Sequence, residues 1–90
     1  MALYASRGYC MARLERWQDA LMDFDAALAA MDDDEDDIST RFNRGSVLLR
    51  LGDTTKAKVD FQRVVALAQD DDAQLVSAAK SHLQDFLLSS

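Results

Sequence analysis

Two stretches of this chain read alike: residues 7–28 are RGYCMARLERWQDALMDFDAAL, and residues 44–65 are RGSVLLRLGDTTKAKVDFQRVV. A displacement of 37 residues brings identical side chains into register along both stretches. The identical pairs include Arg7 and Arg44, Gly8 and Gly45, Arg13 and Arg50, Leu14 and Leu51, Ala20 and Ala57, and Phe24 and Phe61. Coincidence at so many positions is improbable by chance, so the chain contains an internal repeat.

Within each copy, apolar residues recur at the spacing of one helix face, so each copy predicts two helices. The four predicted faces are Tyr4, Gly8, Met11 and Leu14; Ala20, Phe24, Ala27, Leu28 and Met31; Ile38, Gly45, Leu48 and Leu51; and Ala57, Phe61, Val64, Val65 and Ala68. The connections at residues 15–18 and 52–53 are short, and short connections join antiparallel neighbours. Each copy is therefore expected to be a helical hairpin, with Asp53 capping the second helix of its pair.

After the second copy, residues 72–88 predict a fifth helix, which has no partner helix after it. Its apolar stripe is Val76, Ala79, Leu83, Phe86 and Leu87. Asp71 and Gln74 have the spacing of a capping box, with the aspartate as the cap. Proline is absent and there are only three glycines, so few residues can break a helix or form hairpin turns. The sequence therefore predicts an all-α fold.

The two copies resemble the tetratricopeptide repeat, a helix-turn-helix unit of about 34 residues. The family places a small residue within its first helix, and an alanine, an aromatic residue and another alanine along its second. The matching residues are Gly8, Ala20, Phe24 and Ala27 in the first copy, and Gly45, Ala57 and Phe61 in the second. The usual first-helix aromatic is only Tyr4 in the first copy and Arg41 in the second, and the closing proline is missing from both.

This resemblance implies an α-α superhelix of two hairpins and a capping helix, forming a single domain over residues 1–90. Repeat 1 would cover about residues 1–34, repeat 2 about residues 38–70, and the capping helix about residues 72–88. The physical reason for the pattern is packing, because a glycine in the first helix lets the second helix approach closely.

Charge and composition exclude several kinds of partner. The formal net charge of −6 argues against nucleic acid, whose phosphates require lysine and arginine. We find no run of about eighteen apolar residues and no signal-peptide pattern, which favours a cytoplasmic protein without a membrane-spanning helix. The single cysteine, Cys10, excludes an internal disulfide.

In a solenoid of helical hairpins, the first helix of each pair lines the concave surface. These helices carry arginines without acids, whereas the second helix carries Asp19, Asp23 and Asp25, which we place on the convex back. The predicted partner-binding residues are Tyr9, Arg13, Phe42, Asn43, Ser46, Leu49, Arg50 and Lys80. We therefore expect a basic groove that binds a protein or peptide, with an acidic or C-terminal segment favoured.

Alternatives to this groove remain open. Arg7 and Arg44 would equally suit ion pairs with acids of adjacent helices, and Tyr9 and Phe42 could pack between the repeats. The family's lysine- and asparagine-based carboxylate clamp is matched here only by Asn43, which disfavours the binding of chaperone tails.

No catalytic, cofactor or metal site emerges, and we expect a protein that is not an enzyme. The acidic run at residues 32–37 lacks the glycine and glutamate positions of a calcium loop and is interpreted as a solvated loop. Trp17 is interpreted as a packing residue, and His82 as a packing or surface residue. Cys10 is interpreted as a small buried apolar residue, because no base can be placed beside it.

A second hypothesis for the function comes from a different class. Stacked repeats usually need about three units for stability. The chain could therefore be a structural oligomerisation segment or a fragment of a longer tetratricopeptide array. Homo-oligomers in sedimentation of the isolated chain would support that alternative.

Overall fold

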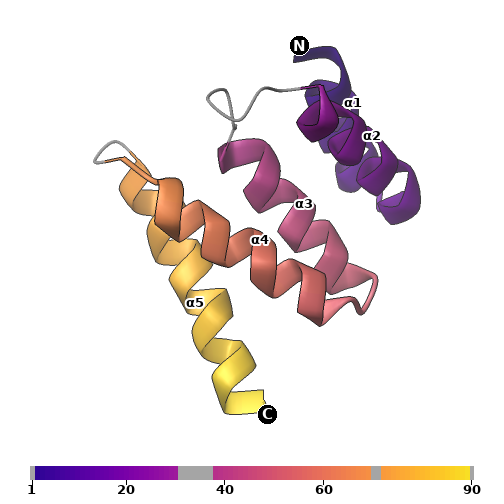
Figure 1. Ribbon diagram of the computed structural model, residues 1–90. Coiled ribbons are helices and arrows are strands. Elements are labelled where there is room, and N and C mark those ends of the chain that lie inside the picture. Colours follow the sequence, from indigo (N-terminus) through magenta and orange to yellow (C-terminus); the bar gives the residue numbers. More distant parts are fainter. Residues whose placement is uncertain (1, 31–37, 70–71, 90) are drawn as a thin grey trace.

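The structure is a computed structural model that describes residues 2–30, 38–69 and 72–89. Its helices are α1 (Ala2–Arg13), α2 (Trp17–Ala29), α3 (Ile38–Arg50), α4 (Thr54–Leu67) and α5 (Ala73–Ser89). In Figure 1 they follow one another in chain order, from the indigo α1 and α2 through α3 and α4 to the yellow α5. The described part of the chain contains no strand, which confirms the all-α prediction and the expected order of five helices.

Each helix packs chiefly against its neighbours in the chain. The pairs α1 with α2 and α3 with α4 form the two hairpins, and α3 also packs against α2. The fifth helix packs against α4 and touches α3. None of the described helices is long and apolar enough to cross a membrane.

The turn of the first hairpin is shorter than predicted, because Trp17 already begins α2. The N–H of Arg16 donates to the carbonyl of Met11 at 2.9 Å, and that of Glu15 to the carbonyl of Ala12 at 3.0 Å. This pair of bonds is a Schellman ending, which closes a helix with one left-handed residue. Leu14, predicted to lie on the core face, is instead in this turn and is 66% exposed.

The second hairpin turns in the same way around Gly52, whose φ is 83°. The N–H groups of Gly52 and Asp53 donate to the carbonyls of Leu49 and Leu48 at 3.1 and 2.9 Å. Asp53 then caps α4, since its carboxylate accepts the N–H of Lys56 at 3.2 Å, as predicted. The predicted cap Asp71, along with Met31 and the acidic run at residues 32–37, lies outside the described residues.

The predicted contact between glycine and phenylalanine is present in both hairpins. A Cβ added at Gly8 would lie 2.8 Å from Cε1 of Phe24, and one added at Gly45 would lie 3.0 Å from Cζ of Phe61. Both rings are fully buried. Glycine at these two positions therefore allows each helix pair to approach closely enough to seat the ring.

Two apolar clusters fill the fold. The first contains Ala20, Phe24 and Val47, with Met11, Ala12, Trp17, Leu21 and Leu51 packed around it. The second contains Leu48, Ala57, Phe61, Val64 and Ala79, with Leu75 and Leu83 of α5 among the residues around it. The first cluster joins α3 to the first hairpin, and the second joins α5 to the second hairpin.

Candidate functional site

Each hairpin contains an arginine–aspartate pair between its two helices. The Nε of Arg7 donates to both carboxylate oxygens of Asp23 at 3.0 Å, and its Nη2 donates to Oδ1 at 2.7 Å. In the second hairpin, Nε and Nη2 of Arg44 donate to the two oxygens of Asp60 at 2.9 and 2.7 Å. The Asp60 side chain is only 1% exposed, and it is paired both by this fork and by Nη1 of Arg41, which lies 3.5 Å from Oδ1.

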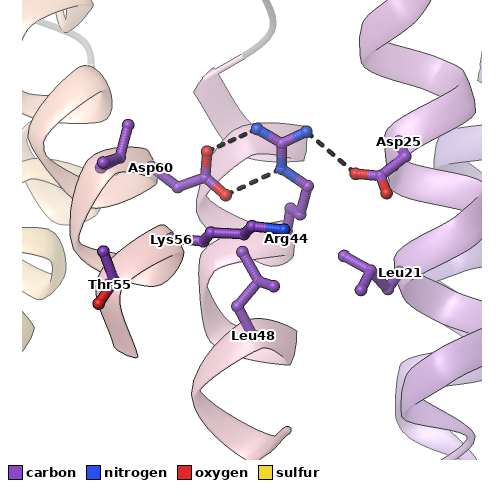
Figure 2. Close-up of a pocket in the computed structure, with 8 residues that line it drawn as sticks. Leu21, Asp25, Arg44, Leu48, Thr55, Lys56 and Asp60 are labelled. Carbon is purple, nitrogen blue, oxygen red and sulfur yellow. Dashed lines mark hydrogen bonds and ion pairs between the residues drawn. The ribbon is translucent and has the colours of Figure 1, made fainter. Parts of the chain in front are cut away.

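Arg44 also links the two hairpins. Its Nη1 donates to Oδ1 of Asp25 in α2 at 3.1 Å, and Figure 2 shows its guanidinium between the carboxylates of Asp25 and Asp60. The hydrogen bond to Asp60 is the largest cause of the raised pKa of Arg44, and the bond to Asp23 does the same for the pKa of Arg7. Both arginines therefore stay charged at every pH at which the protein would be handled.

These pairs answer one question that the sequence left open. Arg7 and Arg44 bind acids of adjacent helices, and their charges do not make a basic concave face. Asp23, which was placed on the convex back, is a buried partner of Arg7. The sequence reasoning missed Asp23 and Asp60 as partners, although the displacement of 37 residues also superimposes these two aspartates.

Four of the predicted binding residues lie together in a groove of about 200 Å³. Residues of α1, α2 and α3 line it: Tyr9, Ala12, Trp17, Phe24, Asn43, Ser46, Val47 and Arg50. We call it the α1–α3 groove. Tyr9 is half-exposed at its edge. The hydroxyl of Ser46 donates to the carbonyl of Phe42 at 3.2 Å, so it is already engaged within α3.

Two exposed arginines each lie over an aromatic ring at this groove. The guanidinium carbon of Arg50 is 5.6 Å from the centre of the Trp17 ring. That of Arg13, which lies beside the groove lining, is 5.9 Å from the centre of the Tyr9 ring. Among the described residues, no ion pair joins either guanidinium to an acid. Each guanidinium group is therefore positioned by an aromatic ring and can still bind an anion.

The other three predicted residues lie elsewhere. The Phe42 ring meets Phe61 edge-on with centroids 5.4 Å apart, and it lies 6.0 Å from the His82 ring of α5. Leu49 packs against the second apolar cluster. Lys80 is exposed on α5 and does not line the groove. Phe42 and Leu49 pack towards the second apolar cluster, to which α5 also contributes. The polar residues Asn43 and Ser46 of α3 therefore line the groove.

A second, larger cleft of about 370 Å³ lies between the hairpins, where α2, α3 and α4 meet (Figure 2). Leu21, Leu48 and Val59 supply its apolar lining. Three of its four charged lining residues pair with one another, because Arg44 is shared by Asp25 and Asp60; the fourth, Lys56, lies 3.9 Å from Asp53 outside the lining. In the larger cleft Arg44 is held by two acids, whereas Arg50 in the smaller groove has no acidic partner among the described residues.

The remaining candidates for chemistry do not form a site. The His82 ring stacks on Phe61 at 4.7 Å, and Trp17 packs against the first cluster, as predicted for both. Cys10 was predicted to be buried and is exposed, because it lies on a face of α1 that no described helix covers. No group of three histidine, cysteine or acidic side chains that could hold a metal occurs within residues 2–30, 38–69 and 72–89.

The comparisons with known proteins agree with this architecture. A family model described as the tetratricopeptide repeat matches residues 1–70, which include both hairpins. No curated protein and no solved structure matches the chain.

Proposed function

Because this chain belongs to the tetratricopeptide repeat family, whose members are in general protein–protein interaction modules, we propose that its α1–α3 groove binds a segment of a protein partner. The favoured ligand is an acidic peptide segment. The observation that carries the proposal is the pair of arginines, Arg13 and Arg50, each lying over a ring and neither ion-paired with an acid of the described residues. Anionic side chains accept charge-assisted hydrogen bonds from such guanidinium groups.

The groove offers polar groups and apolar surface at the same place. Asn43 contributes a carboxamide, which can donate to a peptide carbonyl and accept from a peptide N–H. Tyr9 and Trp17 contribute rings beside it, and rings of this kind add contact area at a small cost in side-chain entropy. A segment with acidic residues on either side of an apolar one would match this arrangement.

The position of the buried ion pairs supports the same choice. Since Arg7 and Arg44 are neutralised by Asp23 and Asp60, the positive charge that remains on α1 and the C-terminal end of α3 comes from Arg13 and Arg50. Two arginines do not require a long, uniformly acidic ligand. A short segment with one or two carboxylates would be enough.

To test the proposal, the intact chain is used to select binders from an acidic peptide library, and the affinity of a selected peptide is measured by fluorescence anisotropy. We expect Arg50→Ala to weaken binding by about tenfold or more, because a hydrogen bond to a charged group contributes about 1.5 to 3 kcal/mol. Arg50→Glu should weaken it further. The affinity should also fall as salt is raised.

The matched control is Lys58→Ala, which removes one exposed positive charge from α4, away from the groove. Its affinity should stay within about twofold of the parent chain, since rim charges at a distance are screened. Equal affinities for the parent chain, Arg50→Ala and Arg13→Ala would remove the groove as the binding site.

A further inference from the structure

The cleft of about 370 Å³ between the hairpins has an apolar floor and two walls that carry polar groups (Figure 2). Leu48 of α3, which is 4% exposed, lies at the floor, and Leu21 of α2 and Val59 of α4 line the walls. Pockets that hold small molecules have volumes of about 300 to 1,000 Å³ and are lined mainly by apolar side chains. This cleft therefore has the size and the apolar lining that a small ligand requires.

Arg44 shows how close the two walls are. Its Nη1 donates to Oδ1 of Asp25 on α2 at 3.1 Å, while its Nε and Nη2 donate to Asp60 on α4 at 2.9 and 2.7 Å. Figure 2 shows this one guanidinium group lying between the two carboxylates. A ligand whose polar groups are only a few bonds apart can therefore reach both walls.

Each wall also has a charged group that can still bind a ligand. On α2, the Asp25 side chain is 56% exposed, and its Oδ2 accepts no hydrogen bond from the described residues. On α4, the Lys56 side chain is 76% exposed, and its ammonium lies 3.9 Å from Oδ2 of Asp53, too far for a hydrogen bond. Lys56 precedes Asp60 by four residues, so both lie on the same face of α4. The cleft thus offers a negative acceptor on α2 and a positive donor on α4.

The charges of the lining limit the kind of ligand that fits. They sum to zero, since Arg44 and Lys56 balance Asp25 and Asp60. A ligand with a single charge would use one wall only, whereas a ligand with one negative and one positive group can pair with both. An α-amino acid carries its carboxylate and its ammonium on one carbon atom. An apolar side chain on the same carbon could then cover the floor at Leu48.

We propose that this cleft binds a free α-amino acid with an aliphatic side chain. The ligand carboxylate accepts a hydrogen bond from the Lys56 ammonium, and the ligand ammonium donates to Oδ2 of Asp25. The hydroxyl of Thr55, which also lines the cleft, is a second donor for the carboxylate. The site is separate from the α1–α3 groove, because no residue lines both. Since Asp25 belongs to the first hairpin and Lys56 to the second, the ligand would join the two hairpins.

The test titrates l-leucine over the millimolar range into the intact chain labelled with ¹⁵N, and follows the amide chemical shifts. We expect saturable shifts at residues of α2 and α4 around the cleft. Asp25→Asn keeps an acceptor for Arg44 but loses the charge, and Lys56→Met keeps the aliphatic stem but loses the ammonium. Each should weaken leucine binding by about tenfold or more, because each removes a charge-assisted hydrogen bond.

The matched control is Lys58→Met, which removes a positive charge from an exposed position of α4 outside the cleft lining. It should bind leucine within about twofold of the parent chain, because exposed charges at a distance are screened. Circular dichroism melts should show that all three variants remain folded. Arg50→Ala should also bind leucine as the parent chain does, which separates this site from the proposed peptide site.

Analogues of leucine distinguish a free amino acid from the end of a peptide chain. N-Acetyl-leucine lacks the ammonium and leucinamide lacks the carboxylate, so each should bind about tenfold more weakly than leucine or worse. Glycine has both charged groups without a side chain to cover Leu48. It should bind about tenfold more weakly as well, because it buries no apolar surface.

The inference is overturned if leucine gives no saturable shifts, or if either Asp25→Asn or Lys56→Met binds it as tightly as the parent chain. N-Acetyl-leucine that binds as well as leucine would instead assign the cleft to the C-terminal residue of a peptide, and leucinamide that does so would assign it to an N-terminal residue. Both of these results overturn the free amino acid. Glycine that binds as tightly as leucine would exclude the apolar floor from recognition and so contradict the aliphatic side chain.

Discussion

Glu15 adopts a backbone conformation that residues other than glycine hold at a cost. Its φ is 61°, and the equivalent residue of the second hairpin is Gly52, with a φ of 83°. We expect Glu15→Gly to raise the free energy of unfolding by about 1 kcal/mol, because left-handed backbone costs a residue with a Cβ about 1 to 2 kcal/mol and glycine loses part of that gain to its freer unfolded chain. Urea denaturation measures the change.

The control for this substitution is Glu15→Ala, which removes the carboxylate and keeps the Cβ. It should leave stability close to that of the parent chain. The opposite change, Gly52→Ala, should lower stability although nothing lies within 4 Å of its new methyl group. A Glu15→Gly chain less stable than Glu15→Ala would contradict the backbone explanation.

At the residue scale, the sequence predicted a helix cap correctly but did not identify which acids pair with the buried ends of the arginines. Asp53 was recognised as a cap because capping depends on residues next to it in the chain. Asp23 and Asp60 lie 16 residues after Arg7 and Arg44, on the second helix of each hairpin, and helix spacing alone leaves several acids within reach. The exposure of Cys10 could not be predicted, since it depends on which face of α1 a neighbour covers.

At the scale of the elements, Arg44 joins α3 to the helices on both sides of it, and its two acidic partners differ in burial. Asp60 of α4 is 1% exposed, whereas Asp25 of α2 is 56% exposed. We expect Asp60→Ala to lower the free energy of unfolding by about 3 to 5 kcal/mol, because it leaves the partly buried Arg44 with only its exposed partner. Asp25→Ala should cost less than about 1 kcal/mol, as exposed ion pairs do.

Urea denaturation of the two alanine variants gives the comparison. If Asp60→Ala is too unstable to measure, Arg44→Met combined with Asp60→Leu provides a second test, since apolar residues of similar size often replace a buried pair without loss. That double variant should recover part of the lost stability, because Arg41 also loses its contact with Asp60. Equal effects of Asp60→Ala and Asp25→Ala would show that burial does not set the strength of these contacts.

Helix spacing predicted all five elements, but it did not predict which helix covers which face. The third helix is apolar on more than one side, with Val47 turned to the first hairpin and Phe42 and Leu49 turned to the second cluster. The sequence pattern identifies these positions as apolar, but it does not show that α5 packs against the same cluster. Tyr9, Asn43 and Arg50 came together because the hairpins stack in register, which the repeat itself specifies.

At the scale of the whole molecule, packing runs along the chain. The helices α2, α3 and α4 each have a packed neighbour on both sides, whereas α1 and α5 end the stack of described helices. In such nearest-neighbour architectures, stability is close to a sum of unit and interface contributions. The α1–α3 groove follows from this layout, since it lies across the two hairpins.

The interface between the hairpins should therefore control whether they unfold together. Val47→Ala removes two methyl groups from a side chain that is 2% exposed, so we expect it to lower the free energy of unfolding by about 2 kcal/mol. Hydrogen exchange should then show α1 and α2 amides losing more protection than those of α4, because the first hairpin can open without the second. Val59→Ala, at a position that is 58% exposed, is the matched control and should change stability by less than about 0.5 kcal/mol. An equal loss of protection in both hairpins of Val47→Ala would instead mean that the two hairpins unfold together as one unit.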